Sequence, residues 1–322
     1  MLRRVTAPLA ISAGLLAAVL LPQLGHAQAP DTERAVLVTG ASSGIGRATA
    51  ELLAERGYFV YAGARSADDI AELNTIENVM AVRLDVTIPA EIEAAVETIR
   101  AEGRGLYGLI NNAGVAVLDP LIEVDEADLD FQLDVNVMGP YRVTKAFAPL
   151  LIESQGRVST TGSLSGFVTW AFGGPYTMSK HAVEAFTDVL AVEMEPFGVR
   201  VSVIEPGNFN SRIYENLVQR REERGTTTEG SLYGDRLDGM LEFATTSRAA
   251  PEPTAVAEAF YRAMTDAEPK SRYLVAPVES EALVTVQAII RRLVEVNEDH
   301  EFTFSRARLV EMLDEALAAS GG

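Results

Sequence analysis

The sequence has no cysteine among its 322 residues, a single tryptophan and only three histidines. The absence of cysteine excludes disulfides, thiolate metal sites and cysteine nucleophiles. The histidines, His26, His181 and His300, are too few and too scattered to indicate a zinc site. We therefore expect no metal and no thiol chemistry.

Basic residues are also scarce. Lysine and arginine together number 27, against 46 acidic residues, which gives a formal net charge of −19 with no Lys/Arg-rich run. A duplex or an anionic headgroup would be repelled over most of such a surface, so we expect no nucleic-acid partner. Apolar residues make up 48% of the chain, which is enough for a substantial core, and the length suits one large α/β domain.

Charge is absent altogether from Val5 to Pro30, after a short basic start. Within this span Ala7–Leu21 is apolar but short for a spanning helix, and Ala27-Gln28-Ala29 is a small-x-small triplet that suits signal peptidase. We interpret residues 1–29 as a secretory signal peptide, which predicts an exported, periplasmic protein. The alternatives are an uncleaved anchor that contacts the membrane through residues 5–21, or a start that is never translated, which would leave the protein cytoplasmic.

Short β-branched runs alternate with amphipathic stretches from Ala35 onward. Continuous apolar strands separated by helices are typical of a parallel sheet covered on both faces. Right-handed crossovers then give a doubly wound, Rossmann-like α/β sheet with its ligand crevice at the strand C-termini. The predicted strands are Ala35–Thr39, Tyr58–Gly63, Val79–Leu84, Leu106–Asn111, Arg157–Thr161, Val199–Ile204 and Tyr273–Ala276. The predicted helices lie near Gly44–Arg56, Pro89–Ala101, Glu126–Ile152 and Tyr176–Met194.

We predict a single domain over residues 32–276, with a helical C-terminal extension over residues 277–322. Residues 211–253 are polar and follow the sixth strand, so they form either a mobile cover over the crevice or a disordered surface loop. Two helices are expected within residues 278–319. They carry an apolar stripe that suits the core or a subunit contact: Ile289, Ile290, Leu293 and Val294.

A glycine-rich turn follows the first predicted strand. Glycines let the backbone turn tightly and approach a diphosphate, whose charge is stabilised by the N–H groups of a helix N-terminus. The spacing Gly-x-x-x-Gly-x-Gly differs from the usual dinucleotide fingerprint, and a glycine turn without a ligand is the alternative. Its place after the first strand of an alternating pattern favours the phosphate site. The predicted phosphate-loop residues are Gly40, Ser42, Ser43, Gly44, Ile45 and Gly46.

The second predicted strand leads into Ala64-Arg65, at the place where an NAD site normally carries an acid for the ribose 2′-hydroxyl. No acid stands there, and Arg65 can pair with a 2′-phosphate in a bidentate way. Ser43 can add a hydroxyl to the same phosphate. NADP is therefore favoured over NAD; the alternative is that Arg65 is an ordinary solvated arginine.

Tyr176 and Lys180 stand at positions i and i+4, so they share one helical face. A phenol with a pKa near ~10 is a poor base, and a cation held close favours its phenolate. Lowering that pKa to about 7 takes roughly 4 kcal/mol, which we expect from Lys180, the cofactor ring charge and partial burial together. Ser163 follows another strand and can hydrogen-bond a reacting oxygen, and Asn136, in an apolar stretch, needs a partner if buried. The combination indicates a nicotinamide-dependent carbonyl or alcohol oxidoreductase.

The order of these motifs resembles the short-chain dehydrogenase/reductase superfamily, in its single-domain branch, over about residues 32–276. The matching motifs are Thr39–Gly46, Leu84-Asp85-Val86, Asn111-Asn112-Ala113-Gly114, Asn136, Ser163, Tyr176–Lys180 and Pro206-Gly207. The resemblance implies that Tyr176 is the general acid/base, and that Lys180 lowers its pKa and binds the nicotinamide ribose. It also implies that Ser163 orients the substrate oxygen and that Asn136 holds the water linking the lysine to solvent.

Further cofactor contacts follow from the same resemblance. Asp85 is expected to contact adenine, Asn112 to lie along the cofactor, and Ser211 to grip the carboxamide where the family often has threonine. The remaining expected cofactor-binding residues are Val86, Ala113, Gly114, Pro206 and Gly207. The sequence around Ser163 and at Arg65 resembles the hydroxysteroid and retinol dehydrogenase branch. A homodimer or homotetramer is expected.

Apolar residues gather near the expected reacting carbon: Val115–Leu118, Phe167, Val168, Trp170 and Phe172. They favour a small apolar ketone, aldehyde or alcohol as substrate, although the aromatic ones suit core or subunit contacts equally well. The leading hypothesis is an NADP-dependent oxidoreductase for such a substrate. A catalytically weak NADP(H)-sensing binding protein on the same fold would have lost the tyrosine or the lysine. An envelope interaction protein with a vestigial site is motivated only by the leader.

Overall fold

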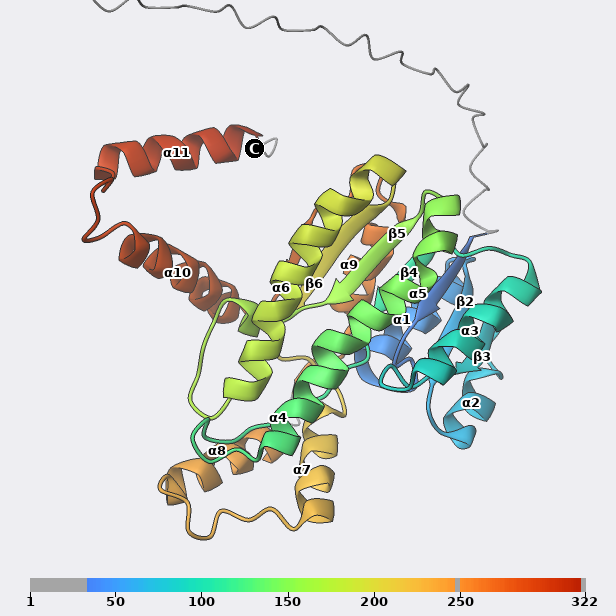
Figure 1. Cartoon of the computed structure of the whole chain (residues 1–322), viewed down its shortest axis with the longest axis horizontal. Helices are drawn as coiled ribbons and strands as arrows, with labels where there is room; N and C mark the ends of the chain where they lie inside the picture. The colour runs from blue at the N-terminus through green and yellow to red at the C-terminus, as the bar shows by residue number, and fades with distance from the viewer. Residues whose placement is uncertain (1–33, 247–249, 320–322) are drawn as a thin grey trace, which may run out of the picture.

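One seven-stranded sheet forms the centre of the molecule (Figure 1). The computed structural model describes residues 34–246 and 250–319, so the leader or anchor predicted for residues 1–29 lies outside it. All neighbouring strands pair in parallel, in the order β3-β2-β1-β4-β5-β6-β7. The strands are β1 Ala35–Val38, β2 Phe59–Ala64, β3 Val79–Arg83, β4 Gly108–Asn111, β5 Arg157–Thr161, β6 Arg200–Pro206 and β7 Arg272–Val275. This confirms the doubly wound α/β fold expected from the sequence.

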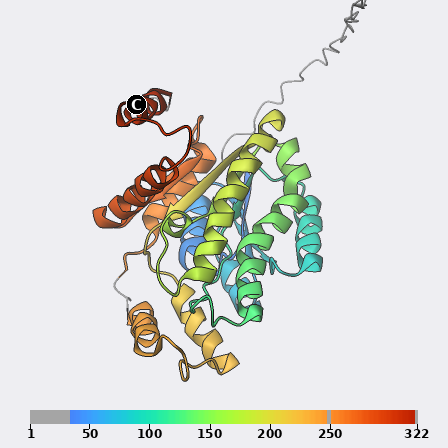
Figure 2. The same cartoon turned by 60° about the vertical axis from the view of Figure 1, so that its left-hand side comes forward.

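Helices cover both faces of the sheet (Figures 1 and 2). Packed on one face are α1 Gly44–Glu55, α2 Ala67–Leu73 and α9 Thr254–Thr265. Packed on the other are α3 Pro89–Glu102, α5 Gly139–Glu153 and α6 Gly174–Met194. Because β1 and β4 are covered on both faces, every residue of these two strands is buried, which explains why Asn111 is their single polar residue.

The sheet reverses its strand order at β1, which pairs with β2 on one side and β4 on the other. Such a switch point opens a crevice at the strand C-termini. Here the loops after the two central strands are tied together. The Thr39 hydroxyl accepts from the backbone N–H groups of Asn112 and Ala113 at 2.9 and 3.0 Å. The Asn112 amide donates to the carbonyls of Thr39 and Gly40 at 3.0 and 3.2 Å.

The long helix predicted for residues 126–152 is interrupted. It consists of α4 Glu126–Leu133, a π-helical turn over Asp134–Met138, and α5. Single π-turns inside helices occur frequently at functional sites. The prediction of one continuous helix was therefore wrong at the turn that carries Asn136.

Residues 211–253 contain two helices, α7 Ile213–Arg224 and α8 Gly234–Thr246. They lie at one end of the molecule, near α4 (Figure 1). Over the described residues 211–246 the alternative of a disordered loop is therefore wrong, and this part of the segment is a helical cover. Whether the cover moves stays a prediction.

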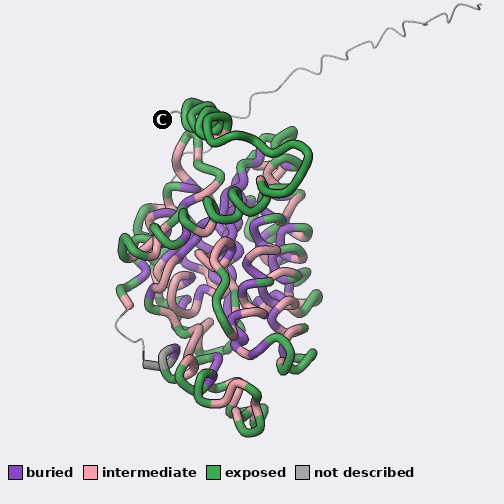
Figure 3. The backbone as a smooth tube through the Cα atoms, turned by 90° about the vertical axis from the view of Figure 1, so that its left-hand side faces the viewer, coloured by how far each residue is buried: buried purple, intermediate pink, exposed green. Residues whose placement is uncertain are grey.

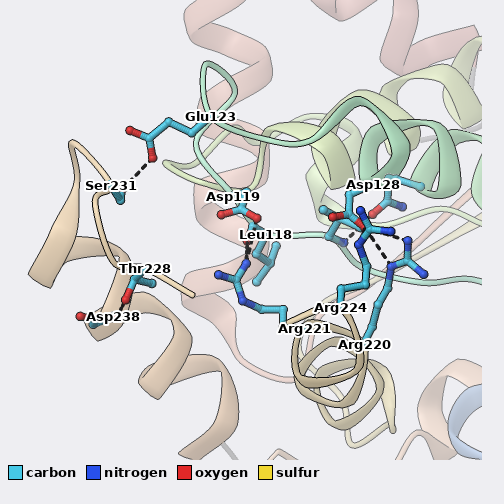
Figure 4. Close-up of polar contacts among 12 residues, drawn as sticks. Leu118, Asp119, Glu123, Asp128, Arg220, Arg221, Arg224, Thr228, Ser231 and Asp238 are labelled. Carbon is cyan, nitrogen blue, oxygen red and sulfur yellow. Dashed lines mark hydrogen bonds and ion pairs between the residues drawn. The ribbon is translucent and has the colours of Figure 1, made fainter. Parts of the chain in front are cut away.

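Ion pairs attach the cover to the segment that follows β4 (Figure 4). The Asp128 carboxylate accepts from Arg220 at 2.7 Å and lies 3.2 Å from Arg224 Nε. The next residue of α7, Arg221, donates to Asp119 at 2.8 Å. The arginine-rich end of α7, which looks like solvated charge in the sequence, is thus fixed to acidic partners about a hundred positions earlier.

Two further helices, α10 Glu279–Val296 and α11 Arg306–Ala319, follow β7 and project away from the sheet (Figure 1). Both are largely exposed (Figure 3). The four apolar residues of the predicted stripe are 44–54% exposed, so their assignment to the core was wrong, and a subunit contact stays a prediction. Across residues 34–246 and 250–319, no helix combines the length and the apolar character needed to cross a bilayer.

Candidate active site

A cavity of about 820 Å³ opens at the C-terminal ends of the strands. It extends from the glycine loop after β1, past α6, to the first turns of α7 and α10. Every residue predicted to contact the cofactor or the reacting oxygen lines this cavity, except Gly46 and Asn136. The chain therefore brings together groups that are spread over more than 170 positions of sequence, from Gly40 to Ser211.

The glycine loop has the conformation that a close backbone approach requires. Gly40 and Gly44 have φ values of 63° and 53°, in the left-handed region that favours glycine. Helix α1 starts at Gly44, and the side chain of its N-cap, Ser43, makes no capping hydrogen bond. The N–H groups of the first helical turn are thus left for an anion. The loop fits the diphosphate of a dinucleotide.

Arg65 lines the cavity beyond the end of β2. Its side chain is 67% exposed, and its guanidinium lies 3.9 Å from the Asp85 carboxylate. Sequence reasoning missed a second acid on this wall, Asp69, because it belongs to α2, a helix that was not predicted. The wall therefore carries one cation and two carboxylates.

Tyr176, Ser163 and Lys180 meet on the opposite side of the cavity. Ser163 lies beside the Tyr176 phenol and acts to lower its pKa. Lys180 Nζ lies 5.6 Å from the centre of the Tyr176 ring and donates to the Thr161 carbonyl at 2.8 Å. The i, i+4 spacing on α6 thus gives the juxtaposition that the sequence predicted.

Burial dominates the proton affinities here. It raises the pKa of Tyr176 to about 12, while Ser163 acts in the opposite direction and Tyr214 adds a further rise. It lowers the pKa of Lys180 to about 8, against the charge of Glu184. The expectation that partial burial helps to lower the tyrosine pKa was therefore wrong, because burial favours the neutral phenol. A neutral phenol is the form that donates a proton.

The side chain of Asn136 is directed at the backbone of the loop after β4. Its Oδ1 accepts from Val115 N–H at 2.9 Å, and its Nδ2 donates to Val115 O at 3.0 Å and to Ser179 Oγ at 3.1 Å. The partner that a buried asparagine needs is thus present. The amide fixes the cavity wall to α6, and the water-holding role stays a prediction.

Part of the predicted apolar wall is in place. Val168 and Trp170 line the cavity, as do Val115, Ala116 and Leu118. Two of the aromatic residues serve other contacts. Phe172 packs edge-on against Tyr233 of the cover at 5.3 Å, and Phe167 lies under the guanidinium of Arg272 at 5.8 Å.

Tyr214 is a second phenol that sequence reasoning missed. It stands in the first turn of α7, lines the cavity and packs against the same apolar cluster as Tyr176. Burial raises its pKa, as does the charge of Glu281 from α10. No motif marks this residue in the sequence, because only the folding of the cover over the crevice brings it to the site.

The comparisons with known proteins agree with this geometry. The short chain dehydrogenase family model matches residues 34–222, more than half of the chain. The chain belongs to the short-chain dehydrogenase/reductase family. Mouse retinol dehydrogenase 5 is 34% identical to this family member over 281 residues, which are 83% of this chain and 87% of the relative.

Two solved structures of the fold contain a nicotinamide cofactor. A short-chain dehydrogenase/reductase from Burkholderia phymatum in complex with NAD has a TM-score of 0.70 and 25% identity, and it covers 84% of this chain and 98% of its own. The closed form of a serine dehydrogenase complexed with NADP⁺ has a TM-score of 0.64 and 27% identity, over 75% of this chain and 94% of its own. This short-chain dehydrogenase/reductase is a nicotinamide-dependent oxidoreductase.

Proposed function

We propose that this enzyme interconverts a hydrophobic ketone or aldehyde and its alcohol, with NADP as the cofactor. The observation that carries the proposal is the placement of Tyr176 and Ser163 together in the cavity, with Lys180 beside the tyrosine ring. Reduction of a carbonyl needs a proton donor for its oxygen, and a second hydroxyl beside that donor can hold the oxygen in place.

In this mechanism the bound nicotinamide supplies the hydride in reduction and accepts it in oxidation. Ser163 holds the substrate oxygen by its hydroxyl. Tyr176 donates its proton to that oxygen in reduction and takes it back in oxidation. Lys180 stabilises the phenolate that forms, because its positive charge is held beside the ring by the Thr161 carbonyl.

The residues around the cavity support the binding of a dinucleotide. The N–H groups of the first turn of α1 would hold the diphosphate, Asp85 the adenine end, and Ser211 the carboxamide. Asn112 would act indirectly, because its amide is already bonded to the loop after β1. Arg65 would pair with the 2′-phosphate of NADP.

The apolar wall supports a hydrophobic substrate, since Val168, Trp170, Ala116 and Leu118 lie beside the tyrosine end of the cavity. A relative named retinol dehydrogenase is consistent with this substrate class. The alternative, a catalytically weak NADP(H)-sensing protein, predicts a degraded catalytic set. The contact between Tyr176 and Ser163 counts against it.

The test is NADPH oxidation by the full chain with a panel of carbonyls of increasing apolar size, beside hydroxylated ketones of matched size. We expect turnover that rises with apolar size and is low for the hydroxylated set. Tight NADPH binding without turnover of any carbonyl would favour the sensing protein. Faster turnover of the hydroxylated set would contradict the proposed substrate class.

Cofactor choice gives a separate prediction. NADPH should bind more tightly than NADH, and Arg65→Ala should weaken NADPH binding about tenfold while it leaves NADH binding unchanged, because the charged hydrogen bonds go to the 2′-phosphate. The Kd of each cofactor measures this. Arg83→Ala is the matched control, since that exposed arginine pairs with Glu91 and does not line the cavity. Equal Kd values in the parent enzyme would refute the preference for NADP.

A further inference from the structure

Two glutamates that have no part in the proposed mechanism are buried below the catalytic residues. Glu184 on α6 is 8% exposed, and Glu205 on β6 is 2% exposed. Their carboxyl groups, called the carboxyl pair, both lie 3.0 Å from the guanidinium of Arg272. Burial raises the pKa of Glu205 to about 8, and the neighbouring glutamate adds to the rise.

The hydrogen bonds around the carboxyl pair are incomplete for two ionised groups. Arg272 of β7 donates to Glu184 Oε2 at 3.0 Å and to Asp188 at 2.8 Å, and its Nε lies 3.0 Å from Glu205 Oε1. Within the described part of the chain, Glu184 Oε1 accepts no hydrogen bond, and Glu205 Oε1 has only its ion pair with Arg272. Buried carboxylates normally find hydrogen-bond donors, and two negative charges beside the same guanidinium repel each other. A single proton held between the two carboxyl groups supplies a hydrogen bond and removes the repulsion.

The carboxyl pair also touches both catalytic segments. Glu184 stands one helical turn after Lys180, and its charge raises the pKa of that lysine against the effect of burial. On its other side it contacts the loop that carries Ser163. Side-chain carbons placed at Gly162 and Gly166 would come within 3.1 and 2.8 Å of Glu184 Oε1, so the carboxyl fills the space beside both glycines of the serine loop.

Few other charges face the carboxyl pair. Helix α6 contributes Lys180 and Asp188, and β7 contributes Arg272. The loop over residues 162–167 contains no charged side chain. Arg157 of β5 points to the opposite face of the sheet, where it bonds the Tyr107 hydroxyl and the Ala263 carbonyl. Among these groups, the carboxyl pair is therefore the one nearest to Lys180 whose charge changes when a proton is gained or lost.

We propose that Glu184 and Glu205 share one proton, and that the pair positions the Ser163 loop and sustains the charge on Lys180. Both act through other residues and are positioning residues. The effect on catalysis rests on the proposed function, whereas the shared proton does not. Loss of that proton at alkaline pH adds a negative charge near the lysine and so delays its deprotonation.

The shared proton is tested by infrared spectroscopy of the full chain grown with ¹³C-carboxyl glutamate. Asp119, whose pKa burial also raises, stays unlabelled. We expect a labelled band of a protonated carboxyl at neutral pH that disappears with a midpoint near pH 8, the pKa of Glu205. Glu205→Gln should lack the band. Its absence from the parent protein at neutral pH would overturn the shared proton, and that observation needs no variant.

The positioning role is tested by pH profiles. The kcat/KM for carbonyl reduction should fall at alkaline pH as Lys180 loses its charge. Glu184→Gln should move that midpoint down by about one pH unit, and Glu205→Gln should move it in the same direction by less. Asp188→Asn, at a side chain that is 59% exposed, should leave it in place. An unchanged midpoint in Glu184→Gln, with activity reduced equally at all pH values, would overturn the role.

A second readout separates this inference from the proposed function. If no carbonyl of the panel is reduced, the same shift of the lysine titration is read from the Kd of NADPH against pH. A shifted Kd profile with the labelled infrared band would support the carboxyl pair although the proposed reaction had failed. An unshifted Kd profile would reject its influence on Lys180.

Discussion

Tyr176→Phe should lower kcat for carbonyl reduction about a thousandfold, while the Kd of NADPH stays within about threefold. The substitution removes the phenol hydroxyl beside Ser163 in the cavity, and it leaves the ring that packs beside Lys180. The proton donor is lost without a change of shape. Steady-state kinetics and fluorescence titration with NADPH measure the two quantities.

The matched control is Tyr214→Phe, which removes a phenol hydroxyl from the same cavity. It should change kcat by no more than about threefold, because Tyr214 stands on the cover and pairs with no serine in the described site. If the Tyr214 variant were inactive and the Tyr176 variant active, the two tyrosines would have to exchange roles.

The direction of the pH dependence follows from the same contacts. Burial raises the pKa of Tyr176 to about 12, so the phenol is protonated throughout the neutral range. Reduction needs the phenol, and its rate should not rise with pH. Alcohol oxidation needs the phenolate, and its rate should rise as pH increases.

Much of the fold follows from local patterns. Arg157–Thr161 is predicted as a strand and is β5 with the same limits, because its β-branched residues lie between two helical patterns. The catalytic helix also follows from sequence, since an i, i+4 pair shares a face in any helix. The pairing of β1 with β4 brings the loops after these two strands together. The local sequence pattern already places each loop at the end of its strand.

Other features depend on contacts between distant segments. The π-turn at Asn136 has no period of its own in the sequence, and the bonds from its amide to Val115 show why the chain adopts it. Tyr214 reaches the cavity only because Arg220 and Arg221 attach α7 to acids after β4. The carboxyl pair joins a helix to a strand, and nothing in the spacing of Glu184 and Glu205 predicts their contact.

Gly46→Ala should lower the free energy of unfolding by about 3 kcal/mol and abolish measurable NADPH binding at ordinary concentrations. A β-carbon at this position would lie 2.2 Å from the Gly40 carbonyl oxygen and 2.3 Å from Asn112 Nδ2. Both atoms belong to the hydrogen bond that ties the loop after β1 to the loop after β4. Gly46 does not line the cavity. It affects cofactor binding because a side chain at this position would break the hydrogen bond between the two loops.

Gly239→Ala should change the free energy of unfolding in the opposite direction. This glycine lies in α8, and a β-carbon there would meet nothing within 4 Å. Alanine should raise the free energy of unfolding by up to about 1 kcal/mol, because it lowers the entropy cost of the helix. Urea denaturation of both variants, with equal m-values, separates packing from helix propensity. A Gly46→Ala variant as stable as the parent would mean that the Asn112 amide and the Gly40 carbonyl can separate at no cost. The hydrogen bond between the two loops would then not hold the phosphate loop in place.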